Sequence, residues 1–114
     1  MIVVIFELEA AEGQRDAYLQ FAAELKPMLS QIDGFISIER FQSLTHPEKL
    51  LSLSFWRDEE AVKQWRNIEQ HRRAQAKGRS HIFAGYRLRV ASVLRDYSLD
   101  EREEAPADSQ QYHR

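Results

Sequence analysis

The 114-residue sequence predicts an α+β fold of order βαββαβ, in which a four-stranded antiparallel sheet carries two helices on one face. Three observations predict it. There are four apolar runs of strand length, two longer segments with apolar residues at three- and four-residue spacing, and turn residues between these elements. Apolar side chains make up 43% of the chain, which is typical of a globular domain.

The first half of the chain predicts a strand followed by a helix. Residues 2–9 are apolar and β-branched, as expected for a strand. Residues 14–32 carry one apolar stripe at helical spacing. Within them, Pro27 predicts a kink or a break, because proline removes a backbone donor and clashes with the preceding turn. Gly34 is predicted to end the segment, since glycine adopts the left-handed conformation found at helix C-termini.

The next two strands are predicted to form an antiparallel hairpin. They cover residues 35–43 and 49–56, and the polar connection 44–48 between them contains a proline of the kind found in turns. Alternation within the first of these strands predicts that Ile36 and Arg40 share one face.

The rest of the domain is predicted to be a helix and a long strand. Asp58 is placed to cap the helix, and Trp65 lies on its apolar stripe. Residues 81–95 alternate as a strand. We expect residues 1–97 to form the domain, and residues 98–114, which are charged and poor in large apolar side chains, to be a disordered acidic tail.

Composition excludes several classes of protein. The chain has no cysteine and no apolar run of bilayer-spanning length, and its first residues lack a basic leader. We therefore expect a cytoplasmic protein that does not bind membranes. Residues 63–95 hold nine basic and one acidic side chains. Nucleic-acid binding is disfavoured, because no aromatic stacking motif accompanies this charge and the formal net charge is −2. No histidine–carboxylate spacing predicts a metal site.

Several predicted strands carry apolar residues on both faces. Two helices can cover only one face of a four-stranded sheet. We therefore expect a symmetric homodimer in which the sheet of a second copy covers the other face.

Three stretches resemble the antibiotic biosynthesis monooxygenase (ABM) family. They are GFI at residues 34–36, FWRDEEA at residues 55–61, and the segment from Trp65 through HRRAQ at 71–75 to Gly78 and Arg79. The resemblance covers about residues 1–97. It implies a ferredoxin-like fold that dimerises into an α+β barrel. Members of the family include cofactor-independent, quinone-forming monooxygenases, haem-degrading enzymes and many proteins of unknown activity.

The match to the haem-degrading members is incomplete. In those relatives a tryptophan at the position of Trp65 helps to distort the porphyrin, an asparagine lies on the first strand, and a histidine about ten residues after the tryptophan binds the iron. In this sequence the last two positions correspond to Glu7 and Gln75. Haem is therefore the less favoured interpretation, and no cofactor is expected.

Each candidate site residue has two interpretations. Trp65 is either a core anchor or a pocket wall whose indole N–H meets a substrate oxygen. His71 is either a surface histidine or a general base at the pocket mouth. Arg87 and Arg89 either belong to a solvated face or hold a phenolate, enolate or carboxylate. Tyr86 is either a core residue or a hydrogen-bond donor in the pocket.

The resemblance implies an oxygenation that starts from a small aromatic or quinol-type substrate. The substrate anion would pass an electron to dioxygen in a dry cavity, which must hold a proton acceptor and donors for the developing oxyanion. His71 is the first candidate for proton acceptor and Glu7 the second. The expected walls are Phe6, Leu53, Phe55 and Trp65. The competing interpretation is a module that binds a small hydrophobic anion without catalysis.

Overall fold

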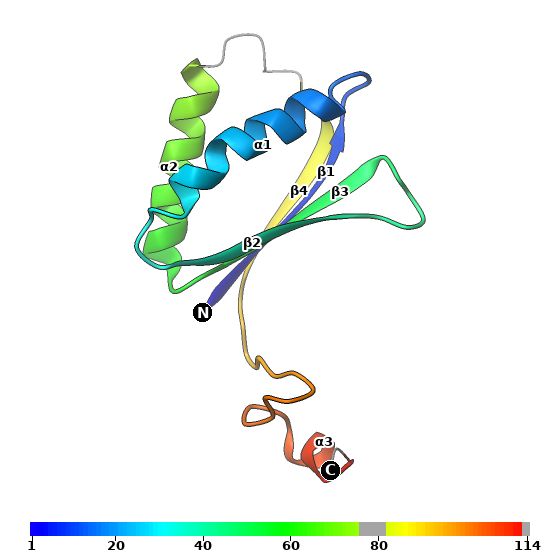
Figure 1. Cartoon of the computed structure of the whole chain (residues 1–114), viewed down its shortest axis with the longest axis vertical. Helices are drawn as coiled ribbons and strands as arrows, with labels where there is room; N and C mark the ends of the chain where they lie inside the picture. The colour runs from blue at the N-terminus through cyan, green and yellow to red at the C-terminus, as the bar shows by residue number, and fades with distance from the viewer. Residues whose placement is uncertain (76–81, 113–114) are drawn as a thin grey trace.

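The predicted element order is confirmed. The computed structural model describes residues 1–75 and 82–112, and within them the side chains of residues 1–70 and 82–110. Its elements are β1 (Ile2–Ala10), α1 (Arg15–Leu29), β2 (Phe35–Gln42), β3 (Lys49–Trp56), α2 (Glu59–Gln75), β4 (Phe83–Ser92) and α3 (Ala107–Tyr112). The strands form one antiparallel sheet in the order β2-β3-β1-β4, and α1 and α2 lie on the same side of it (Figure 1).

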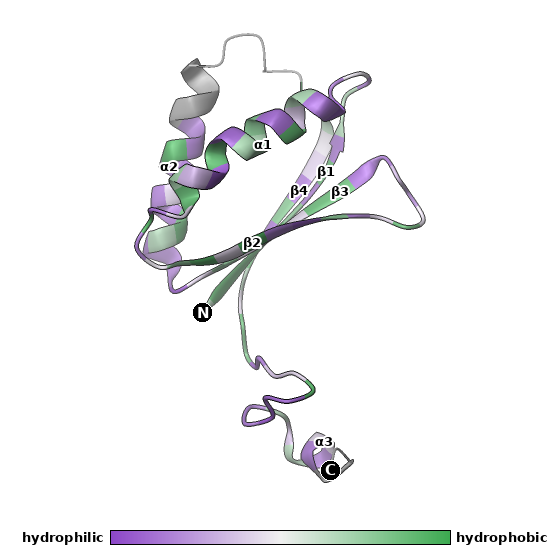
Figure 2. Cartoon of the chain, in the orientation of Figure 1, coloured by the Kyte–Doolittle hydropathy of each residue, from purple (hydrophilic) through white to green (hydrophobic). Residues whose placement is uncertain are grey.

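The core lies between the helices and the sheet. Alternate residues of β1, among them Val4 and Leu8, point toward the helices and are almost completely buried. On β3 the matching face includes Trp56, which is fully buried and whose Nε1 donates to Ser54 Oγ at 2.9 Å. Leu29 of α1 packs in the same cluster. Figure 2 shows the central strands as mainly hydrophobic.

The opposite face of the sheet, here called the open face, carries no helix in the described part of the chain. Its central residues are apolar and only half-buried, because none of the described elements covers them. They are Val3 and Ile5 of β1 and Leu51, Leu53 and Phe55 of β3. The sequence expectation that apolar residues occupy both faces is confirmed.

A register shift at the start of β2 changes which side chains of this strand share a face. Phe35 is opposite Trp56 and Ser37 is opposite Phe55, so Ile36 is the extra residue. Phe35 therefore packs edge-on against Trp56 with ring centroids 5.2 Å apart, whereas Ile36 is 52% exposed. Ile36 and Arg40 were predicted to share a face by simple alternation. The bulge breaks that alternation, because an inserted residue reverses the direction of the side chains before it.

Helix α1 runs through Pro27 and ends at Leu29. Pro27 lies in the last turn of this helix. Proline lacks a backbone N–H, but so little of the helix follows it that the helix is not interrupted. Gly34 does not cap the helix directly. It precedes β2 with φ of +97°, and a Cβ there would lie 2.9 Å from that of Ala61. Glycine at this position allows the beginning of α2 to approach the chain closely.

The start of α2 is fixed by two carboxylates. Asp58 Oδ1 accepts the backbone N–H of Ala61 at 3.0 Å, which confirms the predicted cap. Arg57 donates to both carboxylate oxygens of Asp33, each at 3.1 Å. Hydrogen bonding and charge from Arg57 lower the pKa of Asp33, and the Ala61 N–H and Arg57 lower that of Asp58.

The chain after β4 leaves the sheet as an arm (Figure 1). The segment predicted to be disordered contains the short helix α3. Local contacts hold it: Gln110 Nε2 donates to the Ala105 carbonyl at 2.7 Å, and Arg102 lies 5.1 Å from the Tyr97 ring centroid. The domain boundary at residue 97 stays a prediction. Among the described helices, none has the length and apolar character needed to cross a bilayer.

Candidate functional site

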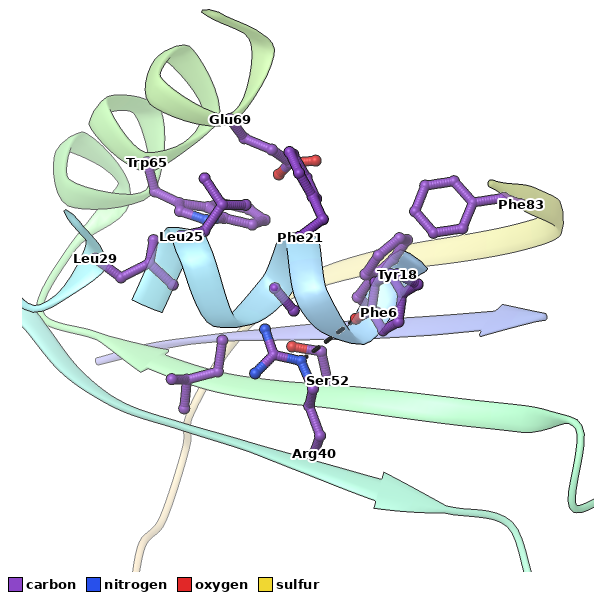
Figure 3. Close-up of a pocket in the computed structure, with 12 residues that line it drawn as sticks. Phe6, Tyr18, Phe21, Leu25, Leu29, Arg40, Ser52, Trp65, Glu69 and Phe83 are labelled. Carbon is purple, nitrogen blue, oxygen red and sulfur yellow. Dashed lines mark hydrogen bonds between the residues drawn. The ribbon is translucent and has the colours of Figure 1, made fainter. Parts of the chain in front are cut away.

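A pocket lies between α1, α2 and the helix side of the sheet (Figure 3). Its free volume is about 30 Å³, a small fraction of the several hundred Å³ of typical ligand pockets. Its walls are mainly aromatic and aliphatic, with only a few polar groups. The lining residues are Phe6, Tyr18, Phe21, Ala22, Leu25, Leu29, Ile38, Arg40, Ser52, Trp65, Glu69 and Phe83.

Aromatic contacts organise one end of the pocket. Phe6 of β1 and Phe83 of β4 meet edge-on with ring centroids 5.6 Å apart, and Tyr18 of α1 lies 5.7 Å from Phe83. At the other end, Trp65 of α2 lies 5.8 Å from the buried ring of Trp56. These contacts join both helices to the sheet, so that the pocket walls are continuous with the core.

The polar groups of the pocket come from different elements. Arg40 Nε of β2 donates to Tyr18 Oη at 3.4 Å, and Ser52 of β3 is the cross-strand partner of Arg40. Glu69 contributes a carboxylate from α2. Figure 3 shows Arg40, Ser52 and the Tyr18 hydroxyl together, with Glu69 on the other side of α1 from them in this view. The pocket therefore offers an apolar interior with a cation and an anion on different walls.

The structure brings together only some of the predicted site residues. Phe6 and Trp65 line the pocket. Tyr86 lies beside it, 5.6 Å from Phe6 between ring centroids, but 64% of its surface is exposed because the helices leave β4 largely uncovered. His71 belongs to α2, and its side chain lies outside the described residues.

The remaining predicted residues lie on the open face and do not reach this pocket. Phe6 is opposite Ser52, so Leu53 and Phe55 point to the other side of the sheet. Glu7 points there as well, and Arg89 Nη1 lies 3.3 Å from Glu7 Oε1. Arg87, opposite Glu7, shares that face. The expectation that all these residues line one cavity with Phe6 and Trp65 is corrected, since adjacent positions of a strand point to opposite faces.

Of the twelve residues that line the pocket, only Phe6 and Trp65 were identified from sequence as site residues. Tyr18 and Phe21 were placed only on the apolar stripe of α1. Arg40 was the one charged residue on an otherwise apolar strand face, and that signal could have marked it. Glu69 lies four residues after Trp65, which puts both on one face of a helix.

Comparison with known proteins identifies the family. A profile of the family described as antibiotic biosynthesis monooxygenase matches residues 1–77. The chain belongs to this family. One relative, the jasmonate monooxygenase ABM of Pyricularia oryzae, is 47% identical over 101 residues, which are 89% of this chain and 47% of the relative. This ABM chain thus spans about half the length of that relative.

Solved structures share the fold of this ABM chain. The Mycobacterium tuberculosis protein Rv0793 superimposes with a TM-score of 0.71 at 16% identity, covering 85% of this chain and 98% of its own. MhuD from the same organism, a haem degrader solved with two haems in its active site, gives a TM-score of 0.64 at 20% identity. That match covers 86% of this chain and all of MhuD. These likenesses support the ferredoxin-like fold alone.

Proposed function

We propose that this ABM-family chain is a cofactor-independent monooxygenase that oxidises a small aromatic or quinol-type substrate with dioxygen in the pocket between the helices and the sheet. One observation carries the proposal. Five aromatic side chains form much of the pocket wall, namely Phe6, Tyr18, Phe21, Trp65 and Phe83, and polar groups stand on both sides of it. An apolar site with a few convergent polar groups suits a flat, electron-rich molecule.

The proposed reaction draws its electrons from the substrate. For an activated CH2 group between aromatic rings, a base removes one proton, and the resulting anion transfers an electron to dioxygen. The substrate radical and superoxide then combine to form a C–O bond, and a proton completes the hydroperoxide. Loss of water breaks the O–O bond and the second C–H bond and leaves a carbonyl. One oxygen atom enters the product, the other leaves as water, and the substrate supplies all four electrons.

The chain supplies the proton acceptor and the surroundings. Glu69 of α2 lines the pocket and is the proposed base, and His71, two residues further along the same helix, stays the alternative. Tyr18 and Arg40 are the proposed donors to the developing oxyanion. Because the unliganded pocket holds only about 30 Å³, substrate enters when aromatic walls such as Trp65 move apart.

The proposed assembly is a homodimer. The half-buried apolar residues of the open face form a continuous surface at the centre of the sheet. Contiguous apolar surface of this kind usually marks an interaction site. A second copy placed sheet to sheet would cover it and complete the α+β barrel.

Haem is a second candidate ligand, because MhuD binds haem and shares the fold. The described residues do not fit it. No histidine side chain occurs among the described pocket residues, and Tyr18 already accepts a hydrogen bond from Arg40. The free volume is also far below the several hundred Å³ of typical cofactor and ligand pockets. Titration with haem while following the Soret band tests this directly, and a saturable shift would favour the haem alternative.

Oxygen uptake with a panel of anthrones and hydroquinones tests the proposed function. Jasmonate is included because of the relative's name. We expect turnover by the wild type and at least a tenfold loss in Glu69→Gln, in the range usual for loss of a general base. Trp65→Phe should raise KM more than it lowers kcat. Glu60→Gln, the same change at an exposed position of α2, is the matched control.

His71→Ala separates the two candidate bases. Loss of turnover in His71→Ala with full activity in Glu69→Gln would move the role of base to His71. The absence of oxygen uptake with every substrate would refute the proposed function and favour a binding module without catalysis.

A further inference from the structure

Arg40 is a half-buried cation at an apolar pocket. It lies on β2, on the same face as Ile38, and its Nε donates to Tyr18 Oη at 3.4 Å. Tyr18 itself is 4% exposed. In the described part of the chain, no carboxylate lies within ion-pair distance of the Arg40 guanidinium. Figure 3 shows the guanidinium directed toward the pocket beside Ser52.

This arrangement calls for an anion. A guanidinium stays charged at all physiological pH values, and partial burial without a counter-ion costs free energy. Bonding through Nε leaves the two terminal nitrogens of Arg40 available for a carboxylate, which guanidinium binds in a bidentate manner. Tyr18 accepts from Arg40 through its oxygen, so its own O–H can donate to the same anion.

The apolar walls define the rest of the ligand. Phe6, Phe21 and Trp65 extend from the Arg40 end across the pocket. A ligand with a carboxylate at Arg40 would therefore bury a hydrophobic body among these rings.

We propose that Arg40, with Tyr18, forms the carboxylate-binding subsite of this pocket, and that the ligand is a small hydrophobic carboxylic acid. This inference rests on the proposed function, because both concern the same pocket. It adds the chemical class of the substrate that the pocket binds. Since the free volume is about 30 Å³, binding must displace the aromatic walls. The fluorescence of Trp65 should therefore change when the acid binds.

Paired ligands that differ only in charge test the proposal. The probes are naphthylacetic acid and jasmonic acid, each compared with its methyl ester by isothermal titration calorimetry and tryptophan fluorescence. We expect each acid to bind the wild type about 10- to 100-fold more tightly than its ester, as for loss of a charge-assisted hydrogen bond. Arg40→Gln should reduce acid affinity to the level of the ester and leave ester affinity unchanged. Tyr18→Phe should weaken acid binding by a few-fold.

Two controls accompany these variants. Arg15→Gln makes the same charge change at an exposed position of α1 outside the pocket and should not alter binding. Arg40→Lys keeps the charge without the bidentate geometry and should give an intermediate affinity. Thermal melts establish that each variant is folded.

Equal binding of acid and ester to the wild type, no binding of either acid, or unchanged acid affinity in Arg40→Gln would each overturn the proposal. The binding assay does not depend on turnover. Acid binding together with no oxygen uptake on any substrate of the panel would refute the monooxygenase proposal and leave the subsite standing. Turnover of quinols without acid binding would refute the carboxylate subsite and leave the monooxygenase proposal standing.

Discussion

Replacing Phe55 by arginine should dissociate the proposed dimer. Phe55 lies on the open face, opposite Val3 of β1 and Ser37 of β2, and is half-buried in the single chain. Complete burial of a phenylalanine side chain contributes about 1.5–3 kcal/mol. At most about a third of its surface is still exposed, so covering it with a second sheet would add up to about 0.5–1 kcal/mol for each chain.

A symmetric interface contains this residue twice. Phe55→Ala should therefore weaken dimerisation by about 1–2 kcal/mol, or about 5- to 30-fold in Kd. Phe55→Arg adds the burial of two cations, and no carboxylate is directly opposite position 55 on either neighbouring strand. Each unpaired charge costs several kcal/mol, so the arginine variant should dimerise at least about 1,000-fold more weakly.

Sedimentation velocity at micromolar concentration measures the outcome. The wild type should sediment as a dimer and Phe55→Arg as a folded monomer. Leu19→Arg places the same charge on the exposed side of α1 and should leave the dimer intact. A wild type that is monomeric, or a Phe55→Arg variant that remains dimeric, would show that the open face is not the interface.

Three further predictions concern stability. Ser54→Ala leaves the buried indole N–H of Trp56 without its acceptor and should lower the free energy of unfolding by about 1–3 kcal/mol. Urea melts measure this loss. In a Trp56→Phe background, which lacks the indole N–H, the same Ser54→Ala change should cost less. Arg57 lowers the pKa of Asp33 in the folded state. The ion pair between them therefore stabilises the fold above about pH 4, and this stabilisation is lost as the pH falls below that value and Asp33 becomes protonated. The Tm of Asp33→Asn should accordingly fall less than that of the wild type between about pH 5 and pH 2.5. Truncation after Tyr97 should leave the Tm of the domain unchanged, because the hydrogen bonds described for the arm are local; a clear fall would show that the arm supports the sheet.

The sequence by itself determined the element order, the cap at Asp58 and the apolar character of both sheet faces. Each of these depends on residues close together in the chain. Spacing of two defines the faces of a strand, spacing of three and four defines a helix stripe, and a carboxylate beside the first helical turn defines a cap. Motifs at residues 34–36 and 55–61 also indicated the family, and the profile match over residues 1–77 confirms it.

Only the tertiary structure decided which strand faces line the same pocket. Phe6 and Trp65 were predicted and line it, whereas Leu53 and Phe55 were predicted and point away. The alternation within each strand was readable, but the pairing of one strand with the next depends on long-range contacts, and a shift of one residue moves every side chain to the other face. The same pairing, which sets Arg40 opposite Ser52, carries Arg40 to the pocket beside a tyrosine from α1. A cation and an aromatic hydroxyl 22 residues apart in the chain meet only because the sheet and helix pack as they do.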